Sequence, residues 1–307
     1  MTPSPKPTVV ITGATGLLGR TVLKAFQESE KYEVIGTGWT RAKEPIQALN
    51  LLSATEVDQA LTRWKPRVLI HCAAEKRPDK AQEDPEAAEA LNVQATGHLA
   101  RICAEQGVFL VYISTDYVFD GEDPPYMPED GTNPLNFYGR TKRAGEIQVL
   151  ETEGSSVCLR VPILYGEAMD PAESAVNILA DRVAHRKPGI DLEMDDVAVR
   201  FPTNTADVAR ALLAMTHQTL AGQTLPRIMH FSSQESFTKY DMCLIFADIL
   251  KVPHEYIKPV KPTPGPATAN RPRNSALAII QTRNAGIPVQ TVDFTSWWRA
   301  YLAIKKQ

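Results

Sequence analysis

A strand-like run that ends in three regularly spaced glycines constrains the fold of this chain more than any other feature. Thr8–Arg20 reads TVVITGATGLLGR, a β-branched run followed by Gly13, Gly16 and Gly19 and then by a helical pattern. The first glycine permits a tight turn, the second lets a pyrophosphate approach the backbone, and the third allows close packing of helix and strand. Because the helix N-terminus offers free N–H groups and positive partial charge, this setting predicts a dinucleotide site.

Strand-like and helix-like segments alternate through the first half of the chain. The expected strands are 8–12, 33–37, 67–71, 109–114 and 156–160, and the expected helices are 17–30, 55–64, 85–106 and 137–153. Such alternation indicates crossover units on a parallel sheet that helices cover on both faces. We therefore expect an α/β fold, namely a Rossmann-type doubly wound parallel sheet with a smaller C-terminal α/β lobe of the substrate-binding type.

The second half of the chain is less regular. Helices are expected over 172–186, 205–217 and 239–251, and a strand over 227–231. Residues 258–273 carry five prolines and predict an ordered loop rather than a regular element. The expected organisation is a flexible lead-in at 1–7, an NADP-binding domain mainly from 8–160, and a smaller lobe from 161–307 with some segments that return to the sheet.

Charge and composition exclude several classes of protein. The 307 residues carry 33 Lys and Arg and 36 Asp and Glu, so the net charge is −3, and we expect neither nucleic acid nor a membrane as a partner. The first seven residues lack the apolar segment of a secretory signal. The four cysteines lack the spacing of a metal site and are expected to be free thiols, which favours a cytoplasmic protein without a metal.

The second expected strand indicates which dinucleotide is bound. An NAD site usually places a carboxylate at the end of this strand, where it binds the ribose 2′-hydroxyl. Here Glu33–Thr37 is followed by Gly-Trp-Thr-Arg-Ala-Lys, and no carboxylate lies at the strand end. Thr37, Thr40 and Arg41 supply hydroxyls and a cation instead, and an arginine can bind a 2′-phosphate through two hydrogen bonds. The pattern therefore favours NADP(H).

A tyrosine and a lysine form the candidate catalytic pair. Tyr138 and Lys142 are four residues apart on an expected helix and share one face. A neighbouring ammonium group stabilises a phenolate and lowers the tyrosine pKa, which suits a proton donor. Ser114 and Thr115 end the expected fourth strand, at the sheet edge where open α/β folds bind ligands, and either hydroxyl could donate to a substrate carbonyl.

Several further motifs resemble a known family. TGATGLLGR, HCAA at 71–74, LNV at 91–93, ISTDYVFDG at 113–121 and YGRTK at 138–142 resemble the extended short-chain dehydrogenases/reductases. ISTDYVFDG, PPY at 124–126, RFPTNTADVA at 200–209 and RPRNSAL at 271–277 resemble the dTDP-4-dehydrorhamnose reductase branch. The resemblance covers nearly the whole chain and implies an NADPH-dependent reductase of a nucleotide-sugar ketone.

A second group of motifs resembles one non-sugar family of that branch, the regulatory β subunits of methionine adenosyltransferase. These motifs are NLL at 50–52, HCAAEKRPD at 71–79, RVPILYGE at 160–167 and ESAV at 173–176. The resemblance implies an NADP-binding, non-catalytic subunit that binds the catalytic subunit that makes S-adenosylmethionine. Residues 296–307 differ from the C-terminal tail of that family, so the resemblance does not extend to the mode of docking.

This resemblance also implies roles for individual residues. It places Thr15, Gly16, Leu17 and Leu18 at the pyrophosphate; Trp39, Thr40 and Arg41 around the adenosine 2′-phosphate; Asn50 and Leu51 by the adenine; Cys72 and Lys76 near the ribose, with Ala73 in the same set; and Tyr138, Lys142 and Leu164 near the nicotinamide. Asn92 matches the helix asparagine that positions the lysine in the wider superfamily.

The sequence leaves three functions open: a regulatory subunit, a reductase, and a scaffold with a vestigial nucleotide site. A nucleotide-sugar reductase needs donors for two phosphates, and the candidates for its substrate pocket are Arg200, Arg271 and Arg273. Pro272 lies between the last two arginines, next to the proline-rich loop, and restricts their reach. The retained Tyr138 and Lys142 permit a reductase and do not demonstrate one.

Overall fold

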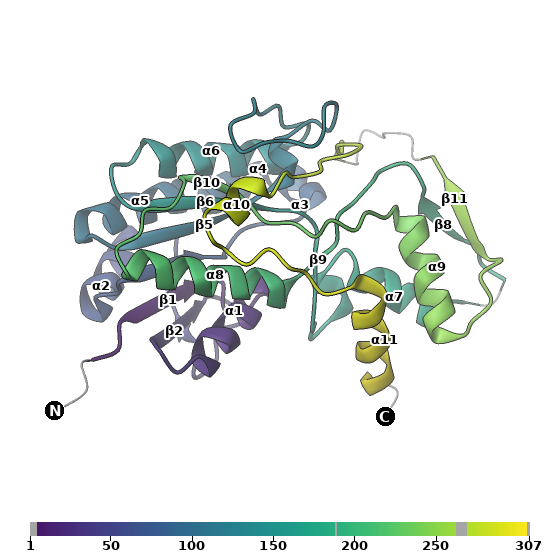
Figure 1. The fold of residues 1–307 in the computed structure, drawn as a ribbon, viewed down its shortest axis with the longest axis horizontal. Coiled ribbons are helices and arrows are strands. Elements are labelled where there is room, and N and C mark those ends of the chain that lie inside the picture. Colours follow the sequence, from purple (N-terminus) through teal and green to yellow (C-terminus); the bar gives the residue numbers. More distant parts are fainter. Residues whose placement is uncertain (1–4, 188, 262–268, 306–307) are drawn as a thin grey trace.

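A seven-stranded parallel sheet forms the centre of the larger lobe (Figure 1). The structure is a computed structural model that describes residues 5–187, 189–261 and 269–305. The strands are β1 (Thr8–Thr12), β2 (Glu33–Gly38), β3 (Gln47–Ala48), β4 (Val68–His71), β5 (Phe109–Thr115), β6 (Ser156–Val161) and β10 (Ile228–His230). Their order is β10-β6-β5-β4-β1-β2-β3, and every neighbouring pair is parallel. This is the predicted doubly wound sheet, with its switch point between β1 and β4.

Helices cover both faces of the sheet, because successive residues of a buried strand point to opposite sides. Val9 and Ile11 pack with α1 (Leu17–Glu28) and α8 (Thr205–Leu220) in one core. Val10 belongs to a second core on the other face. That core includes residues of α2 (Ala54–Trp64), α5 (Ala95–Gln106) and α6 (Phe137–Glu151). The alternation along β1 therefore accounts for the two-sided architecture.

A third core belongs to the smaller lobe, on the right of Figure 1. It is built from α7 (Asn177–Ala184), α9 (Lys239–Leu250) and α11 (Phe294–Lys305) together with the parallel pair β8 (Leu192–Asp195) and β11 (Ile257–Val260). Trp298 is buried in this core against Phe246 and Tyr165, so the terminal helix packs into the smaller lobe.

Two elements from the second half of the chain belong to the larger lobe. β10 pairs with β6 at the sheet edge, and α8 packs on α1. Two short strands, β7 (Leu164–Tyr165) and β9 (Thr203–Asn204), pair with each other, and α10 (Ile280–Asn284) follows the 270s segment. The chain therefore crosses between the lobes more than once, as Figure 1 shows.

Some predicted boundaries need correction. The helix expected over 172–186 begins only at Asn177, and a 3-10 turn, Pro171–Glu173, precedes it. The continuous helix expected over 85–106 is instead α4 (Pro85–Glu89), a π-helical turn (Ala90–Gln94) and α5. The loop predicted over 258–273 is wrong at its start, because residues 258–260 belong to the strand β11. Residues 1–4 of the expected lead-in and 262–268 of that loop lie outside the described residues.

None of the helices in the described part of the chain is long and apolar enough to cross a membrane. Within the same residues, no three His, Cys, Asp or Glu side chains group as metal ligands would. The four cysteines are free, with Cys72 half-buried and the others buried, as the sequence predicted.

Candidate functional site

The glycine turn is packed so tightly that larger residues do not fit. Gly13 has φ +67°, and a Cβ there would lie 2.7 Å from the backbone N of Ala73. A Cβ on Gly19 would overlap the carbonyl of Gly13. The turn therefore lies directly against the end of β4, where Cys72 and Ala73 follow His71. These glycines make the close approach of turn, helix and strand that a dinucleotide site requires.

The N-terminus of α1 faces this turn without a protein cap. Gly16 is the N-cap residue, and among the described residues no side chain accepts a hydrogen bond there. Thr15, Leu17 and Leu18 lie at the same helix start, and the first turn of α1 carries no acidic residue. The free N–H groups and the helix dipole therefore suit an anion such as a pyrophosphate.

The end of β2 presents the residues predicted to recognise the 2′-phosphate. Trp39 is 55% exposed, and the side chain of Arg41 is 60% exposed. The backbone N–H of Leu49 donates to the carbonyl of Gly38, at 2.8 Å, and so places the following Asn50 and Leu51 beside the strand end. Thr40 lies between Trp39 and Arg41. The structure thus brings the predicted adenosine-side residues together.

Tyr138 and Lys142 lie on the first turns of α6, as the spacing predicted. Asn136 caps this helix, because its Oδ1 accepts from the N–H of Gly139 at 2.9 Å. Lys142 is buried with its Nζ 3.9 Å from the centre of the Tyr112 ring, and burial lowers its pKa to about 7. Burial raises the pKa of Tyr138, and a hydrogen bond with Thr115 acts in the opposite direction. Thr115 is therefore the hydroxyl beside the tyrosine.

Ser114 lies elsewhere, although the sequence treated it as equivalent to Thr115. Its Oγ donates to Oε1 of Glu146 at 2.6 Å, and Glu146 also accepts two hydrogen bonds from Arg160, each at 2.8 Å. All three side chains are buried. Successive residues of β5 point to opposite faces, so only one of the two hydroxyls can face Tyr138. Ser114 serves a buried ion-pair network under the site.

Asn92 lies in the π-helical turn and holds the neighbouring loop. Its side chain exchanges two hydrogen bonds with the backbone of Glu75, each at 3.0 Å, and donates to Oγ1 of Thr141 at 3.0 Å. Thr141 directly precedes Lys142. Asn92 therefore links the helix that carries Lys142 to the segment after β4. It bonds to the backbone of that segment and to the Thr141 hydroxyl rather than to the lysine amine. Single π-turns within helices are frequent at functional sites.

The three predicted substrate-pocket arginines have different environments. Arg200 is buried, donates to the carbonyls of Val199 and Pro272, and places its Cζ 5.9 Å from the Tyr117 ring centre. Arg271 forms an ion pair with Asp79 at 2.7 Å. Arg273 is exposed. The structure therefore brings Arg200 and Arg271 to internal partners and leaves Arg273 at the surface.

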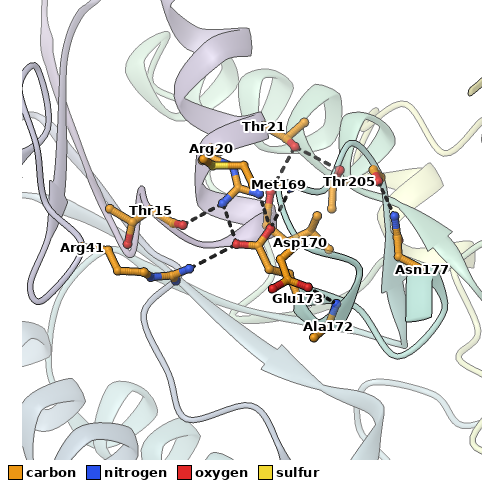
Figure 2. A network of polar contacts seen from close by, with 12 residues as sticks. Thr15, Arg20, Thr21, Arg41, Met169, Asp170, Ala172, Glu173, Asn177 and Thr205 are labelled. Atoms are coloured by element: carbon orange, nitrogen blue, oxygen red, sulfur yellow. Dashed lines mark hydrogen bonds and ion pairs between the residues drawn. The ribbon is translucent and has the colours of Figure 1, made fainter. Parts of the chain in front are cut away.

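The remaining predicted cofactor residues are Cys72, Lys76 and Leu164. Cys72 has its pKa raised to about 12, chiefly by burial, so its thiol stays protonated. Leu164 begins β7, and its carbonyl accepts from Oγ of Ser174 at 2.8 Å. Nζ of Lys76 donates to the backbone carbonyl of Glu173. Figure 2 shows Glu173 beside Arg20 and Arg41.

Sequence reasoning missed two groups that the structure places at the site. Glu173 accepts hydrogen bonds from Arg20 and Arg41, although it lies 132 residues or more away from either in the chain. Lys239, at the start of α9, lies near Arg271 and Arg200, whose charges add to the effect of burial in lowering its pKa. The ESAV motif at 173–176 was the only sequence signal for Glu173, and nothing in the pattern marked Lys239.

The fold and this site define a class. A doubly wound parallel sheet, a glycine turn at the first crossover and a Tyr-x-x-x-Lys pair beside the end of β5 are the features of an extended short-chain dehydrogenase/reductase. The comparison with known families is more specific. The family described as RmlD substrate binding domain matches residues 7–302, and the chain belongs to this family.

Relatives of two kinds match the chain. The chain is 42% identical over 287 residues to a methionine adenosyltransferase 2 subunit beta from Bos taurus, covering 94% of this chain and 85% of that protein. It is 32% identical to a dTDP-4-dehydrorhamnose reductase from Mycolicibacterium smegmatis, covering 91% and 80%. A structure of dTDP-4-dehydrorhamnose reductase from Bacillus anthracis in complex with NADP has a TM-score of 0.81 and 24% identity, covering 98% of this chain and 99% of that chain. These matches confirm the predicted family and fold.

Proposed function

We propose that this chain is an NADP-binding regulatory subunit of methionine adenosyltransferase, and that it acts on S-adenosylmethionine synthesis through association with a catalytic subunit. The observation that carries the proposal is the 42% identity to a methionine adenosyltransferase 2 subunit beta over 94% of the chain, against 32% to the reductase. The cytoplasm is the compartment that suits this role and the free thiols.

The cofactor site is proposed from the residues that fit it. The glycine turn packs closely against the backbone that follows β4, since a Cβ on Gly13 would lie 2.7 Å from the N of Ala73, and the uncapped N-terminus of α1 begins beside it. Thr15 to Gly19 would hold the pyrophosphate, and Arg41 with Thr40 and Trp39 would hold the 2′-phosphate. In this proposal residues 8–160 supply most of the cofactor domain, while 161–307 form most of the second lobe. NADP(H) when bound could supply a hydride; the regulatory role needs only its binding.

The second candidate is an NADPH-dependent reductase of a nucleotide-sugar ketone. One observation favours it: Tyr138 and Lys142 share the first turns of α6, and Thr115 forms a hydrogen bond with the tyrosine. A second observation speaks against it. Arg200 and Arg271, which a sugar diphosphate would need, are committed to backbone carbonyls and to Asp79. The internal pairing leaves the regulatory role better supported.

The proposal is tested with the purified chain and the catalytic methionine adenosyltransferase of the same organism. We expect copurification and a change in the rate of S-adenosylmethionine synthesis when the chain is added. The chain alone should bind NADPH more tightly than NADH, and Arg41→Ser should remove that preference because it deletes the expected 2′-phosphate ligand. Absence of copurification, together with NADPH oxidation on a nucleotide-sugar ketone, would support the reductase instead.

A further inference from the structure

A carboxylate from the second lobe lies among the cations of the proposed cofactor site. Figure 2 shows Glu173 between Arg20 and Arg41. Arg20 donates to both of its carboxylate oxygens, at 3.0 and 2.5 Å, and Arg41 donates to Oε1 at 3.1 Å. Lys76 donates to the backbone carbonyl of the same residue. One glutamate thus draws together three cations.

Those cations come from the three segments that form the proposed cofactor site. Arg20 is in the first turns of α1 and also donates to the carbonyl of Thr15 in the glycine turn, at 2.7 Å. Arg41 follows β2, and Lys76 follows β4. Glu173 instead belongs to the 3-10 turn Pro171–Glu173, which leads into α7 of the second lobe. The contact therefore crosses from one lobe to the phosphate side of the other.

The carboxylate resembles a phosphate in its chemistry. Both are planar or tetrahedral sets of anionic oxygens that accept forked hydrogen bonds from a guanidinium group. Burial raises the pKa of Glu173, but the hydrogen bonds and charge of Arg20 and the hydrogen bonds from Met169 and Arg41 outweigh that effect and lower the pKa overall, so the group is ionised at neutral pH. Its side chain is 12% exposed, whereas that of Arg41 is 60% exposed. An ion pair with so exposed an arginine stabilises the fold little.

Groups other than the carboxylate hold most of the backbone at this turn, although Oε2 of Glu173 also accepts from the N–H of Met169 at 3.2 Å. Oγ of Ser174 donates to the carbonyl of Leu164 at 2.8 Å and accepts from the N–H of Val176 at 3.0 Å. Nδ2 of Asn177 donates to the carbonyl of Gly166 at 2.9 Å. Displacement of the carboxylate therefore requires a rotation of the Glu173 side chain and the loss of the Met169 hydrogen bond, while the bonds of Ser174 and Asn177 keep the turn in place.

We propose that Glu173 is an internal anion that competes with the phosphates of NADP(H) for Arg20 and Arg41, and that it thereby sets the affinity of the site and limits its preference for NADP(H) over NAD(H). This inference rests on the proposed cofactor site. Before ligand binding, Glu173 partly neutralises the cationic site. When a dinucleotide binds, the same carboxylate repels its phosphates, most strongly the 2′-phosphate that NAD lacks.

The test replaces Glu173 by glutamine and measures the dissociation constants of NADP⁺ and NAD⁺ by calorimetry at low salt. Glu173→Gln should tighten NADP⁺ binding roughly five- to tenfold, the size expected when one like charge is removed from a partly buried site, and NAD⁺ binding by less. Asp170→Asn is the matched control, because Asp170 is the N-cap of the same turn. Within the described part of the chain, its Oδ1 accepts only from the N–H of Ala172, at 2.8 Å. It should leave both constants unchanged.

Each other outcome is decisive. If the wild type binds NADP⁺ and Glu173→Gln binds it equally or more weakly, Glu173 positions the arginines and does not compete, and the inference fails while the proposed cofactor site stands. If neither protein binds NADP⁺ at millimolar concentration, the cofactor site fails and the inference fails with it. Glu173→Ala, with the melting temperature of each unliganded variant, separates a loss of fold from a change in affinity.

Discussion

A single methyl group on the glycine turn should lower the melting temperature of the protein and abolish cofactor binding. Gly13→Ala places a Cβ 2.7 Å from the N of Ala73 and 2.8 Å from its Cα, at a backbone φ of +67°. Gly107→Ala is the matched control, since Gly107 ends α5 with φ +66° and a Cβ there would meet no described atom within 4 Å. The two substitutions share the backbone strain, and only the first creates a steric overlap.

The expected sizes follow from these two effects. An alanine in the left-handed region costs about 1–2 kcal/mol. Overpacking against a fixed backbone adds about 1–3 kcal/mol. For 307 residues an unfolding entropy of about 2.1 cal/mol/K per residue gives about 0.65 kcal/mol/K, so the control should lose about 2–3 °C in Tm and Gly13→Ala about 3–8 °C.

Thermal denaturation with and without NADPH measures both effects. A bound ligand raises Tm by mass action, so the wild type and Gly107→Ala should show the same NADPH-dependent rise. Gly13→Ala should show little or none, because the turn must move away from β4 to admit the methyl group. Equal Tm losses in the two variants would refute the steric argument. A full NADPH response in Gly13→Ala would refute the assignment of this turn to the phosphates.

Three further predictions concern the residues beneath and beside the site. Arg160→Met should destabilise the fold by about 3–5 kcal/mol in urea titrations, since it leaves the buried Glu146 without its principal partner, and the double variant with Glu146→Leu should recover part of that loss. Burial lowers the pKa of Lys142 to about 7 in the folded state, below its unfolded value, so the charged lysine destabilises the native state at low pH. Lys142→Met should therefore have a higher urea midpoint than the wild type, and this difference should be largest below about pH 7 and shrink toward pH 10. Tyr138→Phe should abolish any NADPH-dependent ketone reduction and leave stimulation of methionine adenosyltransferase unchanged, as paired assays would show.

The larger lobe was predictable because its elements are locally encoded. Strands buried on both faces read as continuous apolar runs, as Val9–Ile11 does, and the glycine turn fixes the first crossover. The smaller lobe was predicted less well. β8 and β11 have four residues each, too few to show the alternation that identifies a strand. Their pairing also joins segments more than sixty residues apart, which no local pattern indicates. The π-turn at Asn92 likewise depends on packing against Glu75 and Thr141.

The residues of the candidate site likewise fall into those that local sequence patterns indicate and those that only the tertiary structure brings together. Residues that act through the backbone or through helical spacing, such as Gly13 or the pair Tyr138 and Lys142, were identified from local pattern. The difference between Ser114 and Thr115 depends on which face of β5 each occupies, and the buried Glu146 decides it. Glu173 reaches the site through tertiary structure alone, so its charge could be assigned a role only once its distance to Arg41 was known.

Retention of the tyrosine–lysine pair does not by itself indicate catalysis. In this structure burial makes Tyr138 a weaker acid than a phenol in water and makes Lys142 easier to deprotonate near neutral pH. The raised pKa of Tyr138 opposes proton donation, which works best when the donor pKa approaches the working pH. A deprotonated, neutral Lys142 would also no longer stabilise the phenolate. A subunit that only binds NADP(H) has no such requirement, because the same two side chains can hold a ribose and nicotinamide without transferring a proton. The pair is therefore as consistent with binding as with chemistry, and the commitment of Arg200 and Arg271 to internal partners favours binding.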